Sequence, residues 1–144
     1  MKKDTEQLEN ELAEAESVED FLEENRKNFL DYTCAKYLSY LLVEKNLTKS
    51  EVIQKSELDQ TYAYHIFAGR KNHSRLKIIA LALSMKLSVE EPQRLLYYAG
   101  AKRLYVRNEW DSIITFALKN GKSVLETNEL LKNSGESPLL GDNK

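Results

Sequence analysis

The sequence contains little cysteine and few residues that interrupt helices. Its 144 residues include two prolines, five glycines and one cysteine, so intrinsic propensity favours helix along most of the chain. A single cysteine cannot form an internal disulfide, and no apolar run is long enough to span a bilayer. No basic-then-apolar signal segment stands at the start. These absences predict an all-α protein in a reducing, cytoplasmic setting, with no membrane contact.

The patterns that mark common catalytic and metal sites are also absent. There is no glycine-rich phosphate loop, no nucleophile elbow and no Cys and His cluster at metal-ligand spacing. The two histidines are His65 and His73. Cys34 falls on an apolar helical stripe, where a small buried hydrophobe is the structural expectation. We therefore expect neither an enzyme nor a bound metal or other cofactor.

Acidic side chains gather at the start of the chain. Residues 1–28 hold ten acidic and four basic side chains, whereas residues 29–144 hold thirteen acidic and seventeen basic ones. Within residues 69–107 nine basic side chains accompany two acidic ones. A basic cluster of this kind attracts polyanions, and a solvated surface is the alternative explanation. The net charge of −2 therefore conceals a basic body behind an acidic N-terminal segment.

Residues 47–87 contain three short helical patterns in succession. Thr48 and Glu51 form a capping box, which predicts a helix start. Asp59 is a good N-cap for a second short helix, and Gly69 can end it. Two short helices joined by a tight turn indicate a helix-turn-helix. The apolar face of the second helix consists of Ala63, Ile66 and Phe67. The preceding helix carries its apolar stripe at Leu30, Cys34, Tyr37, Leu38, Leu41 and Leu42.

The segment from residue 38 to about residue 95 resembles the phage-repressor type of helix-turn-helix, the lambda repressor and Cro class often called XRE-like. In that family a helix leads into a leucine–threonine pair, matched by Leu47 and Thr48, and then into a second helix, matched by Lys49–Lys55. The recognition helix is matched by Gln60–Ala68. The resemblance implies a five-helix domain that binds double-stranded DNA sequence-specifically and regulates transcription, commonly as a homodimer.

Helical geometry assigns faces to the recognition helix. If Leu58, Ala63 and Ile66 point into the core, the opposite side points toward the major groove. Glutamine can pair bidentately with adenine, and threonine can donate to a base or contact a thymine methyl group. The base-reading candidates are therefore Gln60, Thr61, Tyr64 and His65.

Polar and basic side chains bracket this helix. Such side chains bind phosphates and position a protein on DNA without reading its sequence. The phosphate-contact candidates are Lys49, Arg70, Lys71, Asn72 and Arg75.

Two carboxylates near the start of the recognition helix favour a second interpretation. Glu57 occupies the turn, where the family often has glycine, so it adopts either an ordinary right-handed conformation or a left-handed one costing about 1–2 kcal/mol. Asp59 is explained by capping, but exposed carboxylates repel DNA. The alternative function is a protein–protein interaction module that retains the helix-turn-helix fold without binding DNA.

Capping signals continue beyond the helix-turn-helix. Ser88 with Glu91 and Ser123 with Glu126 read as two further boxes, and Asn108 can cap the helix between them. The last two helices form a C-terminal pair outside the five-helix motif. Their apolar faces either pack on the first helix of the motif and on neighbouring tyrosines, or serve a homodimer or another protein partner.

The sequence divides into three segments. Residues 1–16 form a charged N-terminal extension that is helical or partly disordered, with two leucines too few for a coiled coil. Residues 17–135 form a single all-α domain that contains the helix-turn-helix at residues 47–69. Residues 136–144 read as a flexible tail.

Overall fold

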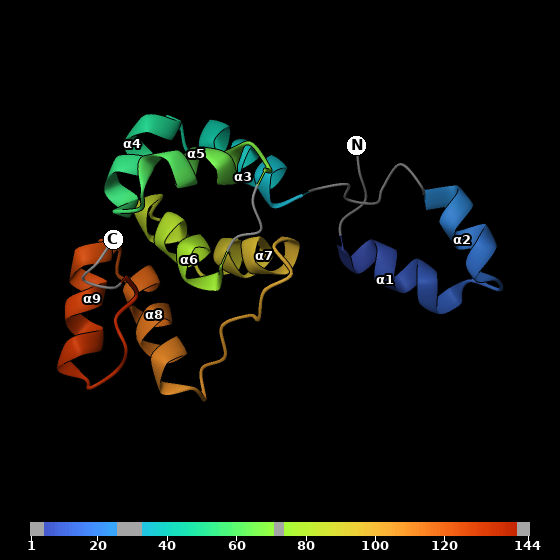
Figure 1. The fold of residues 1–144 in the computed structure, drawn as a ribbon. Coiled ribbons are helices and arrows are strands. Elements are labelled where there is room, and N and C mark those ends of the chain that lie inside the picture. Colours follow the sequence, from blue (N-terminus) through green and yellow to red (C-terminus); the bar gives the residue numbers. More distant parts are fainter. Residues whose placement is uncertain (1–4, 26–32, 71–73, 141–144) are drawn as a thin grey trace. The chain divides into compact units, whose positions relative to one another are not determined.

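All regular structure that the computed structural model describes is helical. The described residues are 5–25, 33–70 and 74–140, and the prediction of an all-α chain is confirmed within them (Figure 1). None of the described helices is long and apolar enough to cross a membrane. The helices are α1 (Thr5–Glu14), α2 (Val18–Asn25), α3 (Cys34–Glu44), α4 (Lys49–Ser56), α5 (Gln60–Phe67), α6 (Arg75–Ser84), α7 (Glu90–Tyr98), α8 (Glu109–Lys119) and α9 (Val124–Asn133).

The chain separates into two compact units, Met1–Asp31 and Tyr32–Lys144. The predicted division after residue 16 is therefore misplaced, because α2 belongs with α1 and not with the larger unit. A side-chain hydrogen bond joins these two helices: Asn25 Nδ2 donates to Glu11 Oε2 at 2.8 Å. Ser17 precedes the second helix, and its hydroxyl accepts from the amide of Asp20 at 3.1 Å.

Local capping determines where the helices of the larger unit begin. Thr48 and Ser123 both form complete capping boxes, and Asn108 caps α8, all as predicted. The box expected at Ser88 forms only in part: Glu91 accepts from the Ser88 amide at 3.3 Å, but α7 begins at Glu90 without a side-chain cap. Short polar side chains at these positions satisfy amide groups that a first helical turn leaves without partners.

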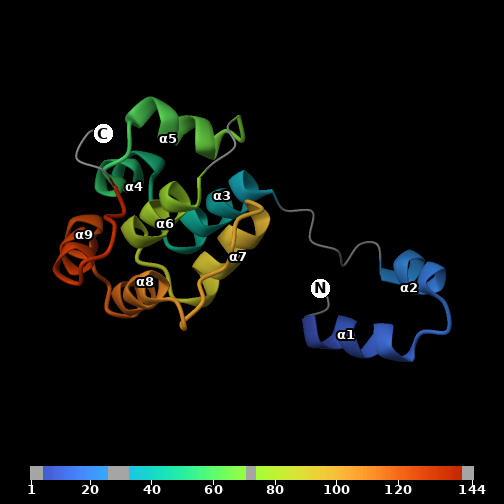
Figure 2. The same ribbon diagram turned by 60° about the horizontal axis from the view of Figure 1, so that its bottom comes forward.

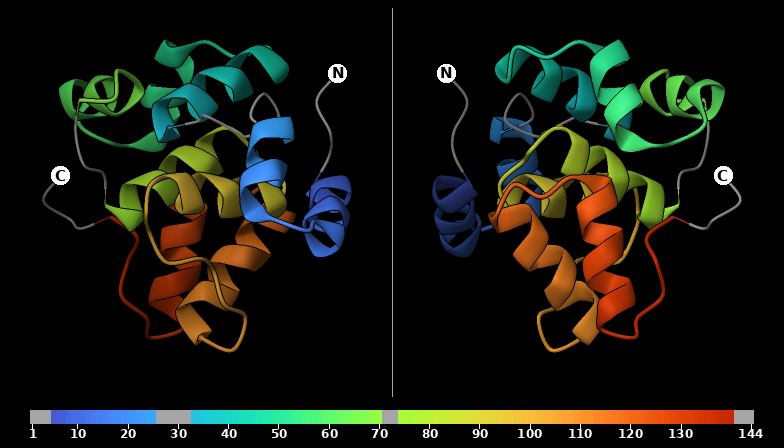
Figure 3. Two further views of the ribbon diagram at one scale, coloured as in Figure 1. Left: turned by 90° about the vertical axis from the view of Figure 1, so that its right-hand side faces the viewer. Right: turned by 90° about the vertical axis from the view of Figure 1, so that its left-hand side faces the viewer.

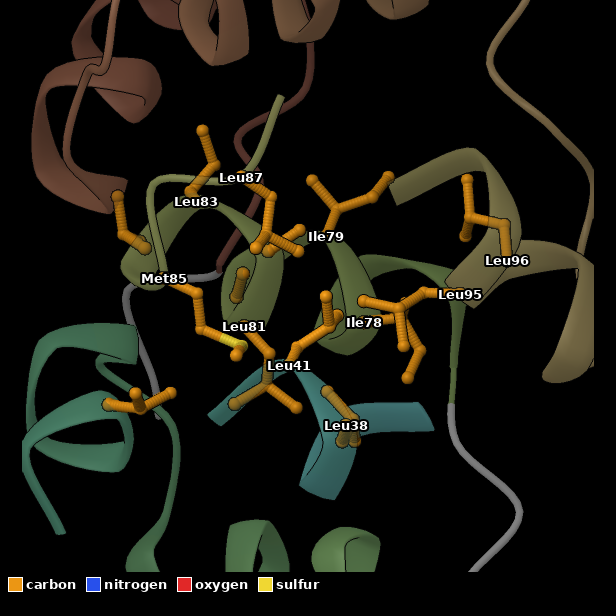
Figure 4. Packing of buried hydrophobic residues seen from close by; sticks show 14 of the residues in the cluster. Leu38, Leu41, Ile78, Ile79, Leu81, Leu83, Met85, Leu87, Leu95 and Leu96 are labelled. Carbon is orange, nitrogen blue, oxygen red and sulfur yellow. The ribbon is translucent and has the colours of Figure 1, made fainter. Parts of the chain in front are cut away.

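Helix α6 is the centre of the larger unit. Every residue from Ile78 to Ser84 is buried, so this helix is apolar around its whole circumference and must be covered on all sides. It packs against α4 and α7 as well as α8 and α9. Figures 1 and 3 show α6 between the α3–α5 group and the C-terminal pair, and Figure 2 shows α3 beside α7. In close view, Leu38 and Leu41 of α3 meet the α6 side chains (Figure 4).

The C-terminal pair, α8 and α9, packs on α6. Its main contact is thus with the central helix. The sequence had suggested packing on the first helix of the motif and on the neighbouring tyrosines instead. Trp110 is partly buried against the core, and its indole Nε1 donates to the carbonyl oxygen of Ser137 at 2.8 Å.

Residues 136–140 pack on this pair, so the prediction of a flexible tail is wrong for this part of the segment. Leu139 is 1% exposed. Asn128 Oδ1 accepts from the amides of Leu139 and Leu140 at 2.6 and 3.3 Å. An apolar side chain buried in this way and a fixed main chain outweigh the polar composition of the segment. Residues 141–144 lie outside the described residues.

Candidate nucleic-acid interface

A tight turn joins α4 to α5. Glu57 takes the left-handed conformation, with φ 64° and ψ 13°. Of the right-handed and left-handed conformations considered from the sequence, the structure therefore has the left-handed one. Ser56 is buried, and its hydroxyl donates to the carbonyl of Ile53 at 2.7 Å while accepting from the amide of Leu58 at 3.2 Å. This side chain therefore replaces the main-chain partners that the end of α4 loses.

Helix α5 has one buried side and one exposed side. Ala63 and Ile66 are completely buried, and Phe67 is 4% exposed. The three buried residues attach the helix to the core through α3 and α4. On the other side, the residues predicted to read bases divide into two groups: Gln60, Thr61 and Tyr64 are exposed, whereas His65 is half-buried.

An open hollow of about 380 Å³ lies where α4 and α5 meet. Gln60 and Tyr64 contribute to its wall from α5, whereas Thr61 and His65 do not. Leu58, expected to point into the core, is partly buried and lines the hollow as well. The remaining lining residues are Ser50, Ile53, Gln54 and Glu57. The hollow thus brings amide, hydroxyl and carboxylate groups together, which can exchange hydrogen bonds with base edges.

The two carboxylates near α5 have different roles. Asp59 caps the helix, since its Oδ2 accepts from the amide of Tyr62 at 2.9 Å. Its negative charge is therefore directed at the positive end of the α5 dipole. Glu57 instead lines the hollow beside Gln60. Of the two, Glu57 is the carboxylate that lines the hollow, whereas Asp59 is the more exposed one.

Two of the predicted phosphate contacts flank α5 with exposed cations. Lys49 begins α4, with its Nζ 5.9 Å from the centre of the Phe67 ring. Arg70 is exposed and follows Gly69, whose φ of 75° turns the chain out of the helix. The Arg70 amide donates to the carbonyl of His65 at 2.9 Å, which fixes its main chain at the end of α5. Lys71 and Asn72 lie outside the described residues.

The prediction that Arg75 binds phosphate is not supported by its contacts. Its Nε donates to the carbonyl of Lys102 at 2.7 Å, and its Nη2 donates to that of Arg103 at 3.1 Å. The same Nη2 pairs with Asp111 Oδ2 at 2.9 Å. Its guanidinium lies 5.7 Å from the ring of Trp110. Arg75 therefore connects α6 to the segment before α8 and to α8 itself.

Sequence reasoning missed this connection at Asp111. Asp111 as a whole residue is 4% exposed, and its carboxylate also accepts from the amide of Tyr105 at 2.9 Å. The available signal was an acidic residue directly beside Trp110, at the start of the apolar pattern of α8. Buried carboxylates are rarely left without a cationic partner, so Asp111 called for an arginine or lysine elsewhere in the chain.

The one cysteine of the chain is buried in α3. Burial raises the pKa of the Cys34 thiol to about 12, so this group is protonated at neutral pH and is a poor nucleophile. Within the described residues, no group of three or more His, Cys, Asp or Glu side chains is arranged to hold a metal ion.

Comparison with known proteins gave no matching family model, no matching curated protein and no matching solved structure. The resemblance to phage repressors therefore rests on the sequence of residues 38–95 alone.

Glycine at position 57 should stabilise the fold relative to alanine. Both Glu57→Gly and Glu57→Ala remove the carboxylate, but only glycine adopts the left-handed conformation without a Cβ penalty of about 1–2 kcal/mol. We expect Glu57→Gly to exceed Glu57→Ala by about 1 kcal/mol in urea denaturation. Equal stability of the two variants would contradict the strain at this position.

Proposed function

We propose that this chain binds double-stranded DNA sequence-specifically through α4 and α5 and regulates transcription. The observation that carries the proposal is the division of α5, whose Ala63, Ile66 and Phe67 are buried while Gln60, Thr61 and Tyr64 are exposed. A major groove about 12 Å wide admits one helix, and the N-terminal residues of a recognition helix contact base edges. Gln60 is the first residue of α5.

The flanking cations support the same function. Lys49, the first residue of α4, and Arg70, three residues after α5, are both exposed. In the proposed complex they bind phosphates, and Gln60 with Thr61 reads bases. Each phosphate contact makes log affinity fall with log salt by about 0.9 units of slope. Tyr64 closes one side of the hollow and contacts a base or sugar from there.

Selection from a random pool of duplexes, followed by sequencing, tests the proposal directly. The enriched duplex should then lose affinity steeply between about 50 and 200 mM salt. A pool that shows no enrichment, together with no shift of any duplex at low salt, would contradict DNA binding.

Gln60→Ala should relax the preference at one base position of the enriched duplex, worth about 1–3 kcal/mol of discrimination, because the bidentate amide is lost. Asn133→Ala is the matched control, since Asn133 carries an exposed amide side chain at the end of α9 and does not line the hollow. We expect this control to keep the preference. Anisotropy titrations with single-base variants of the duplex measure both. Loss of the same preference in both variants would argue against reading by α5.

The alternative is an interaction module that contacts protein. Its supporting observations are Glu57 in the hollow and two large apolar side chains on the C-terminal pair, Phe116 at 53% and Leu125 at 58% exposure. A second copy of the chain meeting this surface would also provide the homodimer that paired half-sites require. Light scattering of the chain, with and without the enriched duplex, distinguishes a constitutive dimer from a monomer that pairs on DNA.

A further inference from the structure

The charged side chains in the segment between α7 and α8 are all basic. Lys102, Arg103 and Arg107 are all exposed, and residues 99–108 contain no acidic side chain. Tyr105 and Val106, which lie among these cations, are 55% and 66% exposed. A cluster of exposed cations attracts a polyanion, and its effect is greatest where the main chain is fixed before binding.

Three side chains from different helices fix the main chain of this segment. Arg75 of α6 binds the carbonyls of Lys102 and Arg103. Gln93 of α7 bonds Leu104 twice, its Nε2 donating to the carbonyl at 3.0 Å and its Oε1 accepting from the amide at 2.8 Å. Asp111 of α8 accepts from the next amide, that of Tyr105. Four consecutive residues are therefore held by their main chain, while the Lys102 and Arg103 side chains remain exposed.

Arg75 joins this segment to the start of α6, the helix that follows α5 in the chain. It is five residues beyond Arg70, and a chain of that length spans at most about 18 Å when fully extended. The width of the major groove is about 12 Å. One turn of duplex is about 34 Å long, so a duplex that contacts Arg70 is long enough to extend to residues 102–103.

We propose that Lys102 and Arg103 form a second phosphate-binding site for the DNA that α5 reads, a proposal that rests on the proposed function. The ligand is the duplex backbone: the Lys102 ammonium contacts one phosphate as a point charge, and the Arg103 guanidinium can bind another bidentately. Arg75 and Gln93 are positioning residues, since they bind the main chain of the segment. The site contributes affinity without sequence preference, because phosphates carry no base information.

An acidic protein surface would be attracted to the same cations. The duplex is favoured because Arg75 connects the segment directly to the helix that follows Arg70, so one backbone can bridge the two. A salt titration on DNA separates these occupants, because an acidic protein partner would leave the DNA salt slope unaffected.

The experiment compares two double variants of the full chain on the enriched duplex. Lys102→Ala with Arg103→Ala should reduce the slope of log affinity against log salt by about 1.8, two contacts at about 0.9 each. Affinity should fall by the same factor for specific and random duplexes. Lys119→Ala with Lys122→Ala removes the same charge between α8 and α9 and should keep the wild-type slope. Circular dichroism verifies that both variants are folded.

The outcomes separate this inference from the proposed function. A wild-type chain that binds no duplex overturns DNA binding itself. A wild-type chain that binds, together with an unchanged slope in the Lys102 and Arg103 variant, overturns only the second site. An equal fall of slope in the Lys119 and Lys122 control also overturns it, because the effect would then reflect net charge.

Gln93→Ala tests the positioning role without changing any charge. The variant removes both hydrogen bonds to Leu104 and should give a slope between those of the wild type and the Lys102 and Arg103 variant. A purely structural role of Gln93 would lower stability and leave the slope of the folded protein unchanged, and that result overturns the assignment.

Discussion

Arg75→Ala should lower the free energy of unfolding by about 3–5 kcal/mol, because it leaves the Asp111 carboxylate buried without its cation. The side chains of the pair are 24% and 6% exposed, respectively, so water cannot reach the carboxylate freely. The carbonyls of Lys102 and Arg103 lose a charged donor in the same variant. Urea denaturation, followed by helical circular dichroism, measures the change.

The matched control for this prediction is Arg107→Ala. It removes an exposed arginine from the same segment, and a surface substitution of this kind typically changes stability by less than about 0.5 kcal/mol. Combining Arg75→Met with Asp111→Leu removes both charges and replaces them with apolar groups. The double variant should be more stable than the sum of the single changes predicts. Losses that simply add would show that the two side chains are not coupled.

The helix-turn-helix was predictable because its determinants are local in sequence. Thr48 and Glu51 are three residues apart, and the Asp59 cap bonds an amide three residues later. The exposed side of α5 follows from the helical repeat alone, which placed Gln60, Thr61 and Tyr64 correctly. His65 deviates from this pattern, because it is half-buried.

The role of Arg75 was not predictable because its partners are distant in sequence. They lie 27, 28 and 36 residues further along the chain, and no local pattern indicates which cation meets a buried carboxylate. A basic turn exposed to solvent and a basic segment held by hydrogen bonds from other helices can also have the same amino-acid composition. The basic residues around Arg75 therefore suggested one phosphate-binding role, although the structure separates exposed cations from one that holds the fold together.

The predicted boundaries after residues 16 and 135 are misplaced for a similar reason, because each depends on a contact that no local pattern indicates. Asn25 joins α2 to α1 through Glu11, and Asn128 holds Leu139 and Leu140. In each case one amide side chain attaches a segment. Composition alone had suggested a division after residue 16 in the first case and a flexible tail in the second. Single polar contacts of this kind carry no periodicity, so hydrophobic patterning cannot reveal them.

Ile66→Ala should lower the free energy of unfolding by about 2–5 kcal/mol through the cavity it creates. Ile66 is completely buried and belongs to α5, whose buried residues are Ala63, Ile66 and Phe67. Ile66→Val removes one methylene and should cost about 0.5–1.5 kcal/mol. Denaturant titrations that show no difference between the two variants would contradict close packing at this site.

Helix α5 must be held in place to read a groove, so the milder Ile66 variant should also affect recognition. Ile66→Val keeps the protein folded, yet it loosens the side opposite Gln60 and Thr61. Leu131→Ala is the matched control, because Leu131 is equally buried but belongs to α9. Affinity is measured without urea, at a temperature where both variants are folded. We expect reduced affinity for the enriched duplex in Ile66→Val and unchanged affinity in Leu131→Ala. A displacement of the whole helix shifts every base contact together, which is why a small loss of packing should reduce affinity. Equal affinities in anisotropy titrations would mean that the packing of α5 does not control its readout.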